Sequence, residues 1–189
     1  MASQLCLVLG GVRSGKSAFA ESKVASFSQS NGRSVLYVAT GVAVDDEMKQ
    51  RIQRHQVSRP QEWATLEEPT DLANKMAPLL SDGQDVGTVI IDSVDVWVAN
   101  LLMEHQTESK EAIEKIVTDA ADQLLVLMAV SPQAYVMVSS EVGLSLVPPE
   151  PLGRRFQDLL GLVNQRMAAT ATEVYLVVAG IPTQIKPYD

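Results

Sequence analysis

The sequence is poor in cysteine and in positive charge, and each shortage excludes a class of protein. Cys6 is the only cysteine among 189 residues, so no internal disulfide can form, and its apolar neighbours indicate a buried thiol in a reducing compartment. Lys and Arg number 15 against 23 Asp and Glu, a net charge of −8. This charge argues against partners such as nucleic acid or an anionic membrane surface. An anionic ligand must therefore be bound by a local arrangement of residues.

Long hydrophobic runs are also missing. No window holds about 18 consecutive apolar residues, which predicts no membrane insertion, and Met1–Gly10 lacks the basic start and apolar length of a signal peptide. We therefore expect a cytoplasmic protein. With 46% hydrophobic and 20% charged residues, the composition is that of a folded globular protein. The length and the lack of a low-complexity linker predict a single domain over residues 1–189.

Short apolar runs alternate with helical patterns, which is typical of an α/β fold with a mostly parallel central sheet flanked by helices. Five strands are predicted, at Leu5–Leu9, Val35–Ala39, Thr88–Ile91, Tyr135–Ser139 and Val174–Ala179. Six helices are predicted, at Lys16–Gln29, Asp46–Val57, Asp71–Leu80, Val94–Met103, Lys110–Val130 and Pro151–Ala171. Three stretches broken by Gly, Pro and acidic residues are predicted as loops, namely Arg59–Pro69, Ser81–Gly87 and Val142–Pro151.

The strongest local motif is GGVRSGKS, which fits the phosphate-loop pattern G-x-x-x-x-G-K-[ST] and lies between a predicted strand and a predicted helix. Glycines let backbone N–H groups curl around phosphate oxygens, and the helix N-terminus adds its positive dipole end. Lys16 would reach the β- and γ-phosphates, and Ser17 would coordinate Mg²⁺. The predicted nucleotide-binding residues are Gly10, Gly11, Val12, Arg13, Ser14, Gly15, Lys16 and Ser17. The motif predicts a nucleoside triphosphate ligand without identifying the base.

A second magnesium ligand is predicted at Asp92, which follows the apolar run Val89–Ile91. An acid at the end of a buried strand holds the metal in phosphate-loop enzymes. An aspartate in this position is also common as a helix cap. The phosphate loop in the same chain favours the metal-binding interpretation.

Only two histidines are available for imidazole chemistry, His55 and His105. His55 shares a face of its predicted helix with apolar residues, and a lone histidine there is most often structural. Arg51 and Arg59 lie about one turn on either side. Nearby cations would keep the imidazole neutral and nucleophilic, and would neutralise a triphosphate. His55 is therefore a candidate catalytic residue, whereas His105 lies in a polar stretch typical of the surface.

These segments together resemble a known family. The phosphate loop, the run Ala39–Pro60 (ATGVAVDDEMKQRIQRHQVSRP), the segment IIDSVDVWVANLL and the C-terminal block from SSEVG onward look like the bifunctional adenosylcobinamide kinases / adenosylcobinamide-phosphate guanylyltransferases of cobalamin biosynthesis. The resemblance is nearly end to end and is weakest over Asp71–Gly87 and Glu104–Val130. It implies a RecA-like P-loop NTPase fold and a homotrimer.

The resemblance also implies the reaction. Such an enzyme phosphorylates the aminopropanol hydroxyl of adenosylcobinamide with ATP or GTP, then transfers GMP from GTP to that phosphate and releases pyrophosphate. It implies that His55 is guanylylated by attack on the α-phosphorus, while Mg²⁺ and the phosphate loop with Lys16 hold the leaving pyrophosphate. Outside the phosphate loop, the implied nucleotide contacts are Thr40, Gly41, Val42, Gln56, Val57, Ser58, Arg59, Glu67 and Asp92.

The sequence departs from the family pattern at a few positions. Some members carry two adjacent histidines where this chain has Arg54 and His55, so only His55 can serve here. Gln56 stands where a basic residue is frequent, and Ser140 and Ser145 replace a family asparagine and glycine. None of these changes removes a loop, metal or nucleophile group.

Three questions stay open at this point, about the function, about Glu141 and about the tryptophans. One of the two activities could be retained alone, as in a kinase-only enzyme, or the chain could be a nucleotide-binding regulatory module without turnover. Glu141 could approach the substrate or cap the turn that follows it. Trp63 and Trp97 could stack on a corrin ring, although tryptophans are more often core or interface residues.

Overall fold

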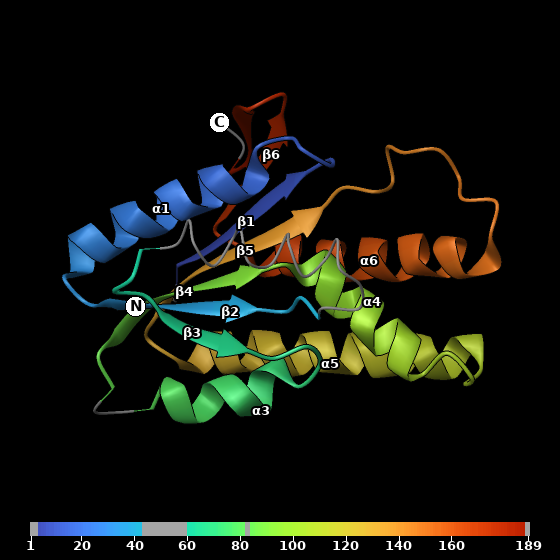
Figure 1. The fold of residues 1–189 in the computed structure, drawn as a ribbon, viewed down its shortest axis with the longest axis horizontal. Helices are drawn as coiled ribbons and strands as arrows, with labels where there is room; N and C mark the ends of the chain where they lie inside the picture. Colours follow the sequence, from blue (N-terminus) through green and yellow to red (C-terminus); the bar gives the residue numbers. More distant parts are fainter. Residues whose placement is uncertain (1–3, 43–59, 82–83, 188–189) are drawn as a thin grey trace.

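A computed structural model describes residues 4–42, 60–81 and 84–187 of the chain, and Figure 1 shows its arrangement. The described strands form one sheet in the order β3-β2-β4-β5-β1-β6-β7, with β7 antiparallel to β6 and the other pairs parallel. The strands are β1 (Leu5–Gly10), β2 (Ser34–Ala39), β3 (Ala64–Glu67), β4 (Val86–Asp92), β5 (Ala134–Ser140), β6 (Glu173–Val178) and β7 (Ile181–Lys186). The helices are α1 (Lys16–Asn31), α3 (Leu72–Met76), α4 (Val94–Glu104), α5 (Lys110–Val130) and α6 (Pro151–Thr170), with a 3₁₀ turn η1 at Ala77–Leu79.

Helices cover both faces of the sheet. In Figure 1, α1 crosses one face, and α3, α4, α5 and α6 lie on the other. Successive strand residues alternate between the two cores, so Cys6 and Val8 of β1 pack under α1, whereas Leu7 and Leu9 pack toward the larger group of helices. Because both faces are covered, the central strands read as continuous apolar runs.

The five predicted strands are confirmed as β1, β2, β4, β5 and β6, but the expected total of five is wrong. The stretch Arg59–Pro69, predicted as a loop, contains β3, and β7 was not predicted at all. Both lie at the edges of the sheet and are largely exposed. An edge strand needs no apolar run, because backbone hydrogen bonds to one neighbour hold it in place.

Four predicted helices are confirmed as α1, α4, α5 and α6, within two residues at each end. The predicted helix Asp71–Leu80 is instead split into α3 and η1. Pro78 explains the break, since it has no backbone N–H to donate to the carbonyl four residues before it and its ring collides with that carbonyl. The predicted helix Asp46–Val57 lies outside the described residues. Among the described helices, none has the length and apolar character needed to cross a bilayer.

The strand order positions the site. β5 lies between β1 and β4, so the phosphate-loop strand and the strand that ends in Asp92 are separated by one strand. In an open parallel sheet, ligands bind beyond the carboxyl ends of the strands. The loops that follow β1, β2, β3, β4 and β5 all leave from this edge.

Candidate active site

The carboxyl edge of the sheet collects most of the predicted site residues. Gly10 of β1 is in register with Ser140 of β5, and Asp92 of β4 is in register with Ala39 of β2. Ala39 is in turn in register with Glu67 of β3. The phosphate loop, Asp92, Glu67 and the Thr40–Val42 segment therefore leave the sheet at one edge, although they are far apart in sequence.

The phosphate loop has the backbone of an anion-binding turn. Gly15 takes the left-handed conformation, with φ 93°, and ends directly at the start of α1. The first turn of α1 has neither an acidic residue nor a side-chain cap. Its N–H groups and the positive dipole end are thus available to an anion. The loop backbone is fixed from outside, because the Gly180 N–H of the β6–β7 turn donates to the Ser14 carbonyl at 2.7 Å.

Lys16 and Gly10 complete the loop. The Lys16 ammonium donates to the Gly11 carbonyl at 3.2 Å, so it lies against the loop backbone. The Ser14 hydroxyl is buried and has no hydrogen-bond partner among the described residues. It packs directly over Gly10, where a Cβ would collide with it and would lie only 2.7 Å from the Val177 carbonyl oxygen. The close approach of three segments therefore requires glycine at position 10.

Asp92 is held by a neighbouring strand. The buried Tyr37 hydroxyl on β2 donates to Asp92 Oδ2 at 2.7 Å, which fixes the orientation of the carboxylate. Asp92 itself is partly exposed at the strand end. A carboxylate oxygen from Asp92 and a hydroxyl from Ser17 are the hard oxygen ligands that Mg²⁺ prefers, so the donor set fits this metal.

Thr40 fastens the end of β2 to the end of β4. Its hydroxyl donates to the Ser93 carbonyl at 2.8 Å and accepts from the Ser93 N–H at 2.9 Å. The Thr40 side chain is fully buried, so its hydroxyl has a structural role within the protein. The residues after it, Gly41 and Val42, are the more exposed part of this segment. Asn100 on α4 adds a second fastening, because its amide donates to the Thr40 carbonyl at 2.8 Å and to the Pro69 carbonyl at 3.1 Å.

A buried polar network fixes the end of β5, and the sequence did not predict it. The Ser139 hydroxyl donates to Asn164 Oδ1 at 2.7 Å, and the Asn164 amide donates to the Ser140 carbonyl at 3.0 Å. The Ser140 hydroxyl donates to Asp95 Oδ2 at 2.7 Å, while the buried Oδ1 has no partner among the described residues. The only signal in the sequence is a polar residue, Asn164, on the apolar face of a helix. The network joins β5, α4 and α6 beside the phosphate loop.

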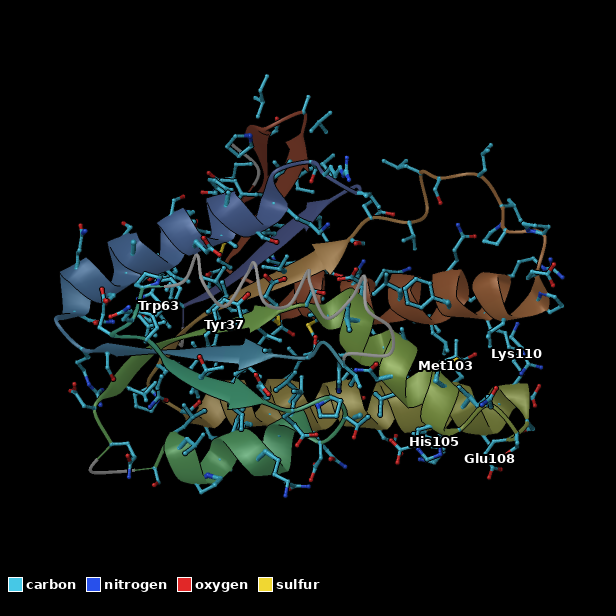
Figure 2. All side chains as sticks on the ribbon, in the orientation of Figure 1. Tyr37, Trp63, Met103, His105, Glu108 and Lys110 are labelled. Atoms are coloured by element: carbon cyan, nitrogen blue, oxygen red, sulfur yellow. The ribbon has the colours of Figure 1, made fainter. Side chains whose placement is uncertain are left out.

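Glu141 caps the turn that follows β5. Its carboxylate accepts from the Gly143 N–H at 2.8 Å, and its own N–H donates to the Gly10 carbonyl at 3.2 Å. Trp97 is a core residue, and Trp63 is partly buried and packs against the core. Trp97 is 1% exposed and donates to the Thr70 carbonyl, and Trp63 stacks on the Tyr37 ring at 6.4 Å, as the labelled pair in Figure 2 shows.

The remaining candidates lie elsewhere or outside the description. The predicted nucleophile and the contacts that follow it, His55, Gln56, Val57, Ser58 and Arg59, are outside the described residues. The Glu67 side chain is exposed at the end of β3. His105 is partly buried, less exposed than its polar sequence context indicated, and ends α4 at a distance from the phosphate loop (Figure 2).

Comparison with solved structures shows the fold. A KaiC-like protein, PH0186 from Pyrococcus horikoshii OT3, is similar with a TM-score of 0.51 at 13% identity, over 93% of this chain and 71% of that one. The flagellar accessory protein FlaH from Methanocaldococcus jannaschii is similar with a TM-score of 0.50 at 16% identity, with the same coverage. These likenesses confirm the predicted RecA-like P-loop fold with a mostly parallel sheet.

Comparison of sequences is more specific. The sequence model of a family described as cobinamide kinase / cobinamide phosphate guanyltransferase matches residues 6–185. The bifunctional adenosylcobalamin biosynthesis proteins CobU of Escherichia coli K12 and Salmonella typhimurium LT2 are 36% and 38% identical over 188 residues, covering 96% of this chain and 99% of each relative. The corresponding protein CobP of Pseudomonas aeruginosa is 36% identical over 180 residues, covering 95% and 96%. The chain therefore belongs to the cobinamide kinase / cobinamide phosphate guanyltransferase family.

Proposed function

We propose that this chain is a bifunctional transferase. It phosphorylates the aminopropanol hydroxyl of adenosylcobinamide with ATP or GTP, and then transfers GMP from GTP to the new phosphate to give adenosylcobinamide-GDP. The observation that carries the proposal is the family match over nearly the whole chain, which includes an intact phosphate loop at the carboxyl edge of the sheet.

The phosphate loop would bind the triphosphate in both reactions. Its backbone N–H groups and the N-terminus of α1 supply fixed donors, and Lys16 supplies a positive charge. Ser17 and Asp92 would hold Mg²⁺, which neutralises phosphate charge as the P–O bond breaks. Gly41, Val42 and Glu67, which follow or end β2 and β3, would contact the rest of the nucleotide, with Thr40 holding their strand ends in place.

The two transfers differ in the phosphorus that is attacked. In the kinase step, the substrate hydroxyl oxygen bonds to the γ-phosphorus, the bond to the β–γ bridging oxygen breaks, and the nucleoside diphosphate leaves with the hydroxyl proton passing to solvent. In the guanylyl step, a nitrogen of His55 bonds to the α-phosphorus of GTP and pyrophosphate leaves. The corrinoid phosphate then displaces His55 and takes the GMP.

Family resemblance around His55, together with the arginines that flank it in sequence, supports its role as the nucleophile. The test is intact-mass analysis after incubation with GTP and Mg²⁺ in the absence of corrinoid. A GMP adduct on the wild type that is missing from His55→Ala supports the role, and no adduct on active wild-type protein contradicts it.

The two activities are tested separately. With ATP labelled in the γ-phosphate, the wild type should transfer label to adenosylcobinamide, and with GTP and adenosylcobinamide phosphate it should release pyrophosphate. Lys16→Ala should lose both reactions, because both use one phosphate loop. A wild type that carries out only one of the two transfers would favour the kinase-only or guanylyltransferase-only alternative. Nucleotide binding with neither transfer would favour the regulatory module.

We extend the proposal to the state of the protein. A homotrimer of single-domain subunits spanning residues 1–189, working in the cytoplasm, is what the family resemblance and the composition support. Light scattering on the purified protein should give three times the 20.5 kDa chain mass. A monomeric mass would contradict the trimer.

A further inference from the structure

One loop at the carboxyl edge exposes large apolar side chains to an unusual degree. It connects β5 to α6 and runs over residues Val142–Pro149, here named the apolar loop. Leu144, Leu146 and Val147 are 82%, 93% and 74% exposed. The apolar loop contains no charged residue, in a chain where one residue in five is charged. Exposed apolar side chains scattered over a surface need no explanation, but two leucines and a valine within four residues of one loop mark a binding surface.

The apolar loop is braced from the inside. The Gln157 amide on α6 donates to the Val142 and Leu146 carbonyls at 3.0 and 3.4 Å, and to the Ser145 hydroxyl at 3.0 Å. Arg154 donates to the Pro148 carbonyl at 3.0 Å and also to the Pro149 carbonyl. Four backbone carbonyls of the apolar loop thus accept hydrogen bonds from α6, while the leucine side chains are exposed. A surface held in this way costs little conformational entropy when a ligand covers it.

The location of the apolar loop ties it to the reaction. It begins where the Glu141 N–H donates to the Gly10 carbonyl, so its first residues lie beside the phosphate loop. Figure 1 shows it leaving the end of β5 and running outward, beyond the carboxyl edge of the sheet, to the start of α6. Val12, at the tip of the phosphate loop, is a further exposed apolar residue, at 83%. A molecule that reacts with a bound nucleotide approaches this same edge.

We propose that the apolar loop binds the corrin ring of the substrate, and this inference rests on the proposed function. The corrin ring is a large macrocycle whose rim carries methyl groups and amide arms, so it offers an apolar area that a triphosphate lacks. Covering two exposed leucines removes apolar surface from water and so favours binding of the ring. Seating the ring on the apolar loop places its aminopropanol arm toward the phosphates. A second copy of the chain that covered the apolar loop permanently would compete with the corrinoid for the carboxyl edge of the sheet.

The test compares two double variants, each of which replaces two exposed apolar side chains by serine. Leu144→Ser with Leu146→Ser alters the apolar loop. Val126→Ser with Val130→Ser, at exposures of 63% and 77%, alters the end of α5 that leads to the amino edge of the sheet. Binding of adenosylcobinamide is measured by equilibrium dialysis with its visible absorbance, ATP binding by calorimetry, and particle mass by light scattering.

The apolar-loop variant should bind adenosylcobinamide at least tenfold more weakly and show a raised KM in the kinase assay, with ATP affinity and particle mass unchanged. The α5 variant should match the wild type. Gln157→Ala, which removes the brace and keeps the leucines, should raise the corrinoid KM without changing kcat, whereas Gln165→Ala, an exposed glutamine on the same helix, should not.

Three results would overturn the inference. Unchanged corrinoid affinity in the apolar-loop variant would show that the ring binds elsewhere. An equal loss of ATP affinity would show a general distortion of the site. A smaller particle mass would show that the apolar loop is an interface between copies of the chain. Failure of the proposed function is seen separately, as a wild type that binds no adenosylcobinamide and transfers no phosphate.

Discussion

Two adjacent glycines at the start of the phosphate loop should respond very differently to the same substitution. In Gly10→Ala, the added Cβ would collide with the Ser14 hydroxyl and lie 2.7 Å from the Val177 carbonyl oxygen. The serine side chain can rotate, but the carbonyl belongs to the β6 backbone. In Gly11→Ala, the added Cβ meets nothing within 4 Å, and Gly11 does not need a positive φ.

The magnitude follows from the crowding. An extra methyl group in a packed site costs about 1–3 kcal/mol, because the neighbouring backbone must move. For a chain of this length each kcal/mol lowers Tm by about 2–4 °C, so Gly10→Ala should lower Tm by about 2–12 °C. The same displacement opens the loop around Ser14, and ATP affinity should fall at least tenfold. Gly11→Ala should leave Tm within about 2 °C of the wild type, because exposed substitutions typically cost under 0.5 kcal/mol.

The assay is thermal unfolding followed by circular dichroism, together with calorimetry of ATP binding in the presence of Mg²⁺. Both variants and the wild type are measured at one protein concentration, since oligomerisation makes Tm depend on concentration. Equal Tm values for the two variants would refute the close contact at position 10. A destabilised Gly10→Ala with unchanged ATP affinity would separate the packing at this glycine from nucleotide binding.

The remaining predictions concern the polar network and the titrating groups. Ser140→Ala should lower the free energy of unfolding in urea by about 1–3 kcal/mol, because it leaves Asp95 without its donor, and an unchanged value would contradict that role. Burial raises the pKa of Glu173, but hydrogen bonds, first that from Lys23 at 2.6 Å, outweigh it and hold the pKa below its usual 4.5. The Lys23–Glu173 bond therefore stabilises the fold above about pH 4.5, and this stabilisation is lost as the pH falls through the lowered pKa. Tm should then depend less on acid pH in Glu173→Gln than in the wild type. Burial raises the pKa of the Cys6 thiol to about 12, so a maleimide at about pH 8 should label it only after unfolding.

Much of the fold could be predicted because the central strands are buried on both faces. β1, β2, β4, β5 and β6 each carry an apolar run that alternates with a helical pattern. β3 and β7 could not be found in the same way, since edge strands are held by backbone hydrogen bonds that leave no pattern in their side chains. Pro78 could have been read as a break in the helix predicted over Asp71–Leu80.

The candidate site was likewise predicted only in part from the sequence. The placement of the phosphate-loop motif between β1 and α1, and of Asp92 at the end of β4, could be predicted because both are local sequence patterns. The partners that orient them could not, because Tyr37 meets Asp92 across 55 residues and Asp95 meets Ser140 across 45. Such contacts depend on the order of strands in the sheet, which no local pattern encodes. The brace of the apolar loop by Gln157 is likewise a product of tertiary structure.

One phosphate loop in this chain is proposed to support two successive transfers to a corrinoid. The most direct measurement is mass spectrometry of the corrinoid during incubation with Mg²⁺, ATP and GTP. Adenosylcobinamide should first gain one phosphate and then GMP, and neither product should form with Lys16→Ala. A corrinoid that keeps its mass in the presence of folded, nucleotide-binding protein would contradict the claim.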